Sequence, residues 1–225
     1  MDAASIKSRW WWARSQMNNI FADIKTYAFE GGWLLVCDIP PIAALLKVAD
    51  ASDIAAIEGF AVASRQAERL AWRIMLRSWA TSNLQWQGEE LEVEYSQLGA
   101  PTILNFPYNH ISVSHCRSKV AVVISDGPCA VDIDSINRNF QSVAPRYLSP
   151  EEQALAQDTT MQAAMWCAKE CLYKLSGRSA LNLRDDIHVK DVDMQQGVIR
   201  GGILHDDVML RSAMPDDEHI IVYHI

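Results

Sequence analysis

The chain has 225 residues and a formal charge of −8, with 49% apolar and 21% charged residues. A chain of this length forms one or two domains with an ample core, and the composition is that of an ordinary globular protein. The acidic balance excludes a general nucleic-acid binder, so the positive charge for any anionic ligand must be gathered locally.

Membrane insertion and export are not indicated by the sequence. No apolar run reaches the length of a membrane span, and the first residues lack the apolar core of a signal peptide. The five cysteines are odd in number and scattered, with no C-x-x-C pair and no histidine placed to complete a zinc set. Reduced thiols in a cytoplasmic protein, without membrane or nucleic-acid partners, are the simplest account.

Strand patterns and one long helix make up the first half of the chain. The first thirty residues show no readable element, and the tryptophans at 10–12 are expected to be a packing cluster. A short helix is expected at 42–49 and the long helix at 54–80. Strands are expected at 33–39, 91–95, 110–115 and 120–125, with a turn at Gly99-Ala100-Pro101.

Arginines recur every four residues on one flank of the expected 54–80 helix, at Arg65, Arg69, Arg73 and Arg77. A solvated helix face is the simplest interpretation of such a run. Because these arginines are bunched within an acidic protein, an anion-binding edge is an equal alternative. Arg73 and Arg77 are expected to do no more than solubilise the helix.

The turn Asp126-Gly127-Pro128 divides the chain into two expected domains, residues 1–126 and 127–225. A strand is expected directly after it, at 129–133. Short alternating runs in the last forty residues are expected to form antiparallel strands.

Two helices are expected within the second half. Ser149 is a plausible N-cap, with Pro150 in the first turn and Glu152 completing a capping box. Residues 161–176 form the clearest helical pattern of the chain, and Gly177 is expected to end it.

Acidic residues of the expected 129–133 strand and the 161–176 helix suggest a shared site. Asp132 and Asp134 are two apart, so both carboxylates lie on one face of a strand. Trp166, Glu170 and Lys174 are spaced by four and form one stripe on a helix. If the stripe meets the strand, three carboxylates gather beside a lysine. Such oxygen ligands suit Mg²⁺, and Mg²⁺ in proteins usually acts on phosphates. The sequence therefore predicts a site for a diphosphate.

Each of these patterns has a simpler interpretation when it is taken alone. Most Asp-x-Asp pairs are strand ends or turn caps. Glu170 and Lys174 are equally well explained as an i,i+4 ion pair, and His115 as a strand histidine with satisfied hydrogen bonds. The combination is more specific than any of its parts.

The segment S-V-S-H-C…A-V-D-I-D…R-Y-L-S-P-E-E…W-C-A-K-E-C-L-Y-K resembles the 4′-phosphopantetheinyl transferases of the larger, surfactin-synthetase-activating (Sfp-like) type. The upstream S-R-Q-A-E-R-L-A-W-R is similar to the arginine-bearing helix of that family, and the resemblance runs from about Trp33 to the C-terminus. It implies an α/β (α+β) fold of two similar halves in a pseudo-two-fold arrangement. Each half would be an antiparallel sheet packed on a long helix, with the active site in the cleft between them and no obligate oligomer.

The activity that the resemblance implies is transfer of the phosphopantetheine arm of coenzyme A to a serine of an apo carrier protein, with release of 3′,5′-ADP. Asp132, Asp134 and Glu170 would hold Mg²⁺, or Mn²⁺, on the diphosphate of CoA. Glu170 would also be the base for the carrier serine, directly or through a metal-bound water, and Lys174 would neutralise charge on the bridging oxygen as it leaves.

Further contacts to CoA are implied upstream of these residues. Ser114 and His115 would contact a CoA phosphate, and Arg65 and Arg69 are candidates for the 3′-phosphate. Trp166 would support the site by packing. Lys169 is expected either at the surface or facing the ligand.

The chain departs from the family pattern at four positions. Ala130 replaces a usual glycine, Asp134 replaces a usual glutamate, Ala100 replaces the lysine of a common G-K-P turn, and Cys171 stands where alanine or serine is common. Loss of that lysine predicts weaker CoA binding and favours one alternative, an impaired CoA- or carrier-binding relative. A second alternative is another Mg²⁺-dependent transferase of nucleotide diphosphates, although no Gly-rich nucleotide loop is visible. Carriers of fatty-acid, polyketide and peptide synthesis all remain open.

Overall fold

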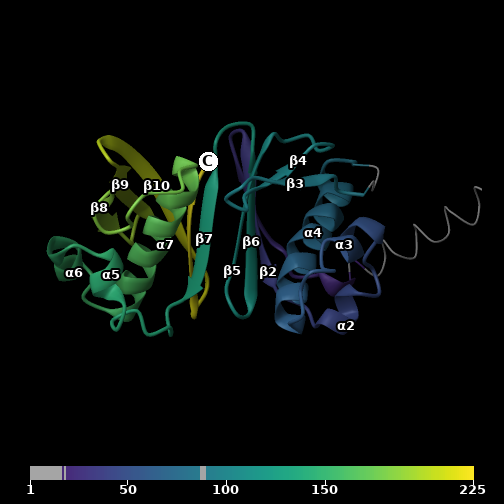
Figure 1. Cartoon of the computed structure of the whole chain (residues 1–225), viewed down its shortest axis with the longest axis horizontal. Coiled ribbons are helices and arrows are strands. Elements are labelled where there is room, and N and C mark those ends of the chain that lie inside the picture. Colours follow the sequence, from purple (N-terminus) through teal and green to yellow (C-terminus); the bar gives the residue numbers. More distant parts are fainter. Residues whose placement is uncertain (1–16, 18, 87–89) are drawn as a thin grey trace, which may run out of the picture.

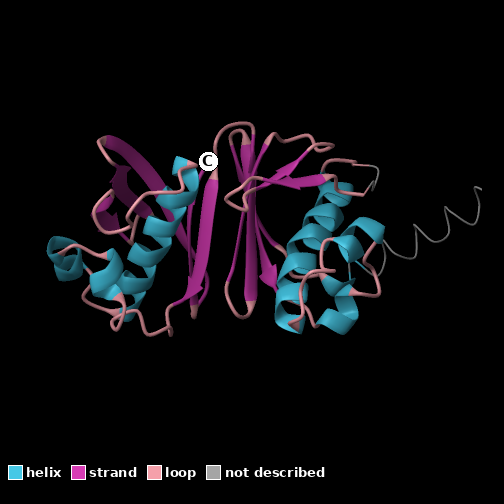
Figure 2. Cartoon of the chain, viewed as in Figure 1, coloured by secondary structure: helices cyan, strands magenta, loops and turns pink. Residues whose placement is uncertain are grey.

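Two antiparallel sheets face each other in the middle of the molecule, and a long helix covers the outer face of each (Figures 1 and 2). The structure is a computed structural model that describes residue 17 and residues 19–86 and 90–225. The tryptophan cluster expected at 10–12 lies outside the described residues. The four layers, helix, sheet, sheet and helix, confirm the mixed α+β class expected from the sequence.

The elements follow one another with short connections. The first sheet has the order β1-β2-β6-β5 and the second the order β7-β11-β10-β9-β8. The first sheet contains β1 (Lys25–Phe29), β2 (Gly32–Asp38), β5 (His110–His115) and β6 (Lys119–Ser125). The second contains β7 (Ala130–Ser135), β8 (Ile187–Asp193), β9 (Val198–Ile203), β10 (Asp206–Asp216) and β11 (His219–His224). A small separate sheet pairs β3 (Val93–Tyr95) with β4 (Pro101–Ile103). The helices are α2 (Ile42–Leu45), α3 (Ala51–Ala55), α4 (Ala63–Asn83), α5 (Ala144–Tyr147), α6 (Pro150–Leu155) and α7 (Thr159–Ser176).

Strand periodicity decides which side chains enter each layer. On β2, Leu34 and Val36 point into the apolar layer between the two sheets, whereas Leu35 and Cys37 pack towards α4. The second sheet repeats this alternation, because Val131 and Ile133 of β7 enter the same layer between the sheets. Successive side chains of a strand point to opposite faces, so the residues between them lie on the α7 side of the sheet.

The long helix of the first half begins later than the sequence pattern suggests. The expected helix at 54–80 is two helices, α3 and α4, separated by residues 56–62. Asp50 caps α3 in a capping box with Asp53, and Gly59 lies in the turn that follows. The 42–49 helix is likewise shorter than expected, because only Ile42–Leu45 is α-helical.

Arg73 and Arg77 are not on a solvated face, so the sequence interpretation of these two residues was wrong. Both side chains are buried and bind the fully buried Asp53, with Arg73 Nε to Oδ1 at 2.8 Å and Arg77 Nη2 to Oδ2 at 2.7 Å. Arg77 also pairs with Asp50. Buried charges require partners of this kind, and here the partners lie in and at the start of α3, at least twenty residues earlier in the chain.

The helix α7 has the ends that its sequence predicts. Asp158 caps its first turn by accepting from Met161 N, and Gly177 ends it in the left-handed conformation at φ 61°. A residue with a side chain is strained at that φ, which explains the glycine. The capping box of Ser149 and Glu152 at the start of α6 is also present.

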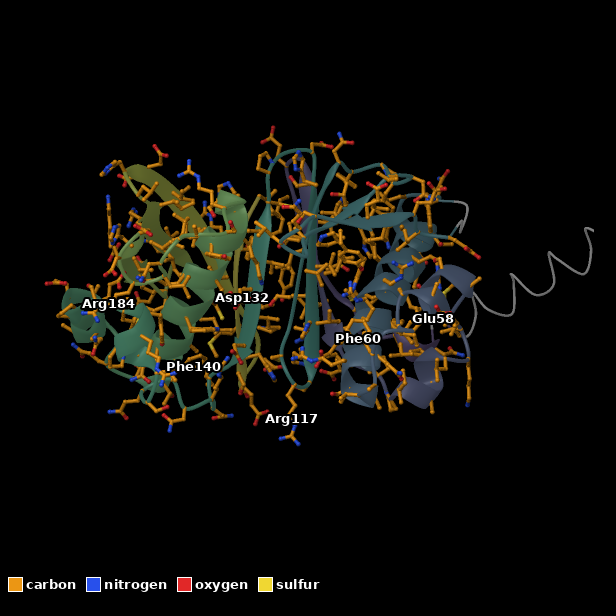
Figure 3. All side chains as sticks on the ribbon, in the orientation of Figure 1. Glu58, Phe60, Arg117, Asp132, Phe140 and Arg184 are labelled. Carbon is orange, nitrogen blue, oxygen red and sulfur yellow. The ribbon has the colours of Figure 1, made fainter. Side chains whose placement is uncertain are left out.

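A chain of hydrogen bonds ties the two sheets together near Arg117, at the edge of the molecule labelled in Figure 3. Ser118 Oγ lies 2.9 Å from His219 Nε2, and His219 Nδ1 lies 2.8 Å from Asp216 Oδ1. The order Ser, His, Asp is that of a hydrolase relay. Ser118, however, lies at an exposed hairpin tip and lines neither of the cavities described below. We therefore read these contacts as a structural link between β6 and β11.

None of the helices within the described ranges combines the length and apolar character needed to cross a bilayer. All five cysteines are free thiols. The strands of the first sheet end at Ser125 and those of the second begin at Ala130. The division into domains 1–126 and 127–225 stays a prediction.

Candidate functional site

Asp132, which is labelled in Figure 3, and Lys174 form the centre of the candidate site, where α7 packs against β7. Lys174 Nζ lies 2.7 Å from Asp132 Oδ1 and donates to the carbonyl of Val131 at 2.9 Å. Burial lowers the pKa of Lys174, but the Asp132 carboxylate outweighs burial, so the pKa lies above its ordinary value. The lysine is therefore held charged, and its position is fixed by the strand.

Serine hydroxyls of β5 position the strand that carries Asp132. Ser114 Oγ donates to Asp132 Oδ1 at 2.7 Å and accepts from Ile133 N at 3.3 Å. Ser112 Oγ accepts from Val131 N at 3.1 Å. These bonds replace sheet pairing on the open edge of β7 and join the two halves at the site. In this structure the Ser114 hydroxyl hydrogen is directed to Asp132, not to a ligand position.

Asp134 lies on the same face of β7 but is engaged elsewhere. Its Oδ1 accepts from Ser135 N at 2.8 Å, and its Oδ2 is paired with Arg138. Among the residues that the structure describes, no three His, Cys, Asp or Glu side chains gather into a group that could hold a metal ion.

Glu170 lies one turn of α7 before Lys174, with its side chain half-buried. Burial raises the pKa of Glu170, and the nearby Asp132 charge raises it further, while Lys174 and Arg138 oppose the shift. No hydrogen bond or ion pair to the Glu170 carboxylate occurs within the described part of the chain. A half-buried carboxylate with a raised pKa and no partner is a candidate for a functional group.

The donor set of Asp132, Asp134 and Glu170 is chemically suited to Mg²⁺ or Mn²⁺, because all three are hard carboxylates. The three groups are close enough to influence one another, since both aspartates raise the pKa of Glu170. Glu170 has no partner among the described residues, Asp132 Oδ1 accepts from Lys174 and Ser114, and Asp134 is paired with Arg138, so the three would have to rearrange to hold one divalent ion together.

A small pocket of about 190 Å³ gathers three of the predicted CoA contacts from separate elements: Arg65 and Arg69 of α4, and His115 at the end of β5. Aromatic rings hold Arg69, whose Cζ lies 4.4 Å from the ring centre of Tyr95 and 5.3 Å from that of Phe60. The cation–π contacts leave the guanidinium donors of Arg69 able to bind an anion.

Glu68 contacts the other two basic side chains of the pocket, Arg65 and His115. Its Oε2 accepts from Arg65 Nη1 at 3.0 Å and lies 3.6 Å from His115 Nδ1. Burial lowers the pKa of His115; Glu68 opposes the shift, while the positive charges of Arg65 and Lys174 support it. His115 is therefore mainly neutral at pH 7 in the free protein. Its pKa responds to charged groups of both halves, Arg65 and Glu68 in the first and Lys174 in the second.

A larger groove of about 940 Å³ adjoins this pocket and is lined by both halves of the protein. The first half contributes the β3–β4 turn with Ala100 and much of β5, and the second contributes Cys129 and the end of α7 with Lys174. Gly99, Pro101 and Val113 line both cavities, so the small pocket and the groove are contiguous. The arrangement can hold an elongated anionic molecule with its phosphates towards Lys174 and the arginines.

Trp166 and Lys169 of the W-x-x-K-E segment contact other protein side chains and do not face the groove. Trp166 packs edge-on against Tyr147, with ring centres 5.0 Å apart, and beside Phe140 at 6.0 Å. Lys169 is fully buried and pairs with Glu152 at 2.7 Å, so the expectation that it faces the surface or the ligand was wrong. The helix turns Lys169 away from Glu170 and into the space between α7 and α6.

Sequence reasoning missed Phe60 and Tyr95, which hold Arg69, and the contact of Glu68 with His115. The spacing of Arg65 and Glu68 on one helix signalled an ion pair. Nothing in the sequence signalled the two rings, because they come from a loop and from the small sheet.

Comparison with known proteins agrees with this geometry. Residues 128–216 match the 4′-phosphopantetheinyl transferase superfamily. A relative from Bacillus pumilus, 4′-phosphopantetheinyl transferase psf-1, is 29% identical over 96 residues, which is 40% of this chain and 41% of the relative. The chain therefore matches less than half of the length of that relative.

The matched segment, residues 128–216, places the second half of the chain in the 4′-phosphopantetheinyl transferase superfamily, as expected from the sequence. The similarity to psf-1 and the length of 225 residues suggest the larger, surfactin-synthetase-activating type within it. Asp132, Asp134, Glu170 and Lys174 lie inside the matched segment, whereas Arg65, Arg69, Ser114 and His115 lie outside it.

Proposed function

We propose that this protein transfers the 4′-phosphopantetheine arm of coenzyme A to a serine of an apo carrier protein and releases 3′,5′-ADP. The observation that carries the proposal is the meeting of Lys174, Asp132 and the unpartnered Glu170 beside a groove that both halves line. A diphosphate in that groove would meet the fixed cation Lys174, with the carboxylates of Asp132 and Glu170 beside it. We further propose that the protein acts as a monomer in the cytoplasm, since one chain supplies both walls of the groove.

The small pocket supports recognition of the 3′-phosphate of CoA. Arg69 is pre-positioned by Tyr95 and Phe60, and Arg65 by Glu68. Arginine binds phosphate through paired donors, and little side-chain freedom is lost when the guanidinium is already held. His115 adds a donor that becomes a cation when a phosphate approaches.

The carboxylates would hold the divalent ion. Asp132 and Glu170, joined by Asp134, would bind Mg²⁺ or Mn²⁺, which as a Lewis acid would offset charge on the diphosphate. Lys174 donates towards the same region, since it already lies at hydrogen-bonding distance from Asp132.

Proton transfer falls to Glu170. Its half-buried carboxylate accepts the proton of the carrier serine hydroxyl as that oxygen attacks the phosphorus joined to the pantetheine arm. The bond from this phosphorus to the bridging oxygen breaks, and Lys174 stabilises the charge that develops on the leaving 3′,5′-ADP. The product carries a new phosphodiester on serine.

Intact-mass measurement of a carrier tests the proposal directly. The purified protein, CoA, Mg²⁺ and an apo carrier are incubated, and the carrier is then weighed. A gain of one phosphopantetheine is the expected result. A carrier that stays unmodified, with each of a fatty-acid, a polyketide and a peptide-synthesis carrier, would refute transferase activity.

An impaired relative of the family is the second candidate function, because Ala100 stands where a phosphate-binding lysine is common and lines the groove. CoA binding by calorimetry without transfer to any carrier would favour this candidate. A protein that binds no CoA but binds another nucleotide diphosphate would instead favour an unrelated Mg²⁺-dependent transferase.

Replacing Arg69 by alanine is expected to weaken CoA binding by about tenfold to a hundredfold, since a charge-assisted hydrogen bond contributes roughly 1.5–3 kcal/mol. The dissociation constant is measured by calorimetry. Arg200→Ala is the matched control, because Arg200 is an exposed arginine of β9 paired with Asp191. An unaltered constant in Arg69→Ala would show that the stacked arginine does not meet the ligand.

The affinity for CoA is expected to rise as the pH falls. His115 is neutral in the free protein because burial lowers its pKa below the ordinary 6.5, whereas a bound phosphate favours the charged imidazole. Binding therefore takes up a proton, and acidification strengthens it. The phosphate of CoA also takes up a proton as the pH falls, which changes the affinity by itself. The variant His115→Gln serves as the control that shows this contribution of the phosphate alone. Between roughly pH 8 and pH 6 the wild type should gain about threefold to tenfold more affinity than the variant. Parallel curves for the two proteins would remove His115 from the site.

A further inference from the structure

Arg138 occupies the carboxylate cluster of the candidate site, although no sequence pattern pointed to it. It lies just past the end of β7, where its backbone N donates to Ser135 O at 3.2 Å. Its Nη1 is paired with Asp134 Oδ2. The guanidinium carbon lies 4.9 Å from the ring centre of Trp166 and 5.0 Å from that of Phe140. Figure 3 shows Phe140 beneath α7, on the same side of the second sheet as Asp132.

Three separate contacts therefore hold this guanidinium: one carboxylate and two aromatic rings. The side chain is nevertheless 47% exposed, so it can leave without opening the core. Trp166 lies on the same face of α7 as Glu170 and Lys174, one turn before Glu170. Because Arg138 stacks on Trp166, it lies at the Trp166 end of this row of side chains. Its charge reaches the neighbouring carboxyl group, because Arg138 lowers the pKa of Glu170 against the effect of burial.

The charges of the cluster explain why a cation is needed there. Asp132 and Asp134 lie on one face of β7 and both raise the pKa of Glu170 on α7, but the three carboxylates do not converge on one point in this structure. Lys174 is bonded to Asp132 alone among them. Without a further positive charge, Asp134 and Glu170 would repel each other in a partly buried place. Arg138 supplies that charge on the Asp134 side.

We propose that Arg138 is an internal competitor of the divalent cation: it holds Asp134 in the metal-free protein and releases it when a hard divalent ion binds the cluster. This inference rests on the proposed function, since it concerns the same carboxylates. The metal-free site is thereby kept charge-balanced, and its intrinsic affinity for the ion is lowered. Asp134 becomes a ligand only in exchange for its arginine.

Binding of Mn²⁺ to the full chain without CoA tests the competition. Free Mn²⁺ is counted by electron paramagnetic resonance during a titration of wild type and of Arg138→Met, which keeps an apolar stem against the two rings. The variant should bind Mn²⁺ about threefold to tenfold more tightly, because a competing cation near the site has been removed. Arg200→Met is the control and should leave the constant unchanged.

An unchanged or weaker Mn²⁺ affinity in Arg138→Met would overturn the proposal, because a weaker one would mean that Arg138 assists the ion or its phosphate. If neither protein binds Mn²⁺, the inference fails, and the carrier-mass assay shows independently whether the transferase function survives.

Tryptophan emission tests the displacement itself. Mg²⁺ should change the emission of the wild type, because Arg138 leaves the face of Trp166. The change should be absent in Arg138→Met and also in Trp166→Phe, which identifies the ring that reports it. A Mg²⁺-dependent change of the same size in Arg138→Met would show that the arginine does not move.

Discussion

Replacing Glu170 by glutamine is expected to slow carrier modification by about a hundredfold to ten-thousandfold, the usual contribution of a positioned general base. The amide keeps the size of the side chain but cannot accept the serine proton and is a poor ligand for a hard cation. The rate is measured as holo-carrier formed per minute by intact mass, at saturating CoA and carrier.

The fold of Glu170→Gln should be intact. The carboxylate of Glu170 has no hydrogen bond or ion pair within the described residues, and burial raises its pKa, so the charge itself is unfavourable there. Glutamine removes that charge, and the free energy of unfolding in urea should be equal to or slightly above that of the wild type. Glu218→Gln, an exposed change in the β10–β11 turn, should alter neither property. Normal turnover by Glu170→Gln would exclude Glu170 from the chemistry.

The architecture could be predicted because it follows from short-range patterns. Alternation on the strands fixed which face of β7 carries Asp132 and Asp134, and spacing by four put Glu170 and Lys174 on one stripe of α7. The structure brings Lys174 to Asp132 as this spacing implied. Both patterns need only the local geometry of a strand and a helix.

The errors concern partners that lie far away in the chain. Arg73 and Arg77 look like a solvated helix face until α3 brings Asp53 to them from twenty residues upstream. The position of α3 depends on the non-helical residues 56–62 between α3 and α4. The sequence pattern predicted one continuous helix across these residues. Phe60 reaches Arg69 for the same reason. A periodic pattern identifies a face of a helix, but only tertiary packing decides what covers that face.

Lys169 shows the same limit within one motif, and it leads to the second large expected effect. Its ammonium group is fully buried, pairs with Glu152 Oε2 at 2.7 Å, and donates to the carbonyls of Ile187 and Leu183 at 2.6 and 2.8 Å. Lys169→Met should therefore lower the free energy of unfolding by about 3–5 kcal/mol, because a buried carboxylate loses its counter-charge and two carbonyls lose a donor. Urea unfolding followed by circular dichroism measures the loss.

A double-mutant cycle with Glu152 separates this pairing from a general loss of packing. Glu152 also accepts from Val189 N and from Ser149 N, so Glu152→Met should be destabilising by itself. In the double variant no charge remains unpaired, and its destabilisation should be about 1–3 kcal/mol smaller than the sum of the single changes. Strict additivity would mean that the two charges do not stabilise each other.

Two adjacent residues of α7 are thus expected to serve different roles, Glu170 in catalysis and Lys169 in stability. Glu170→Gln should slow turnover in a stable protein, whereas Lys169→Met should lower the free energy of unfolding. Lost turnover with an unchanged free energy of unfolding in Lys169→Met would instead assign the lysine to the ligand.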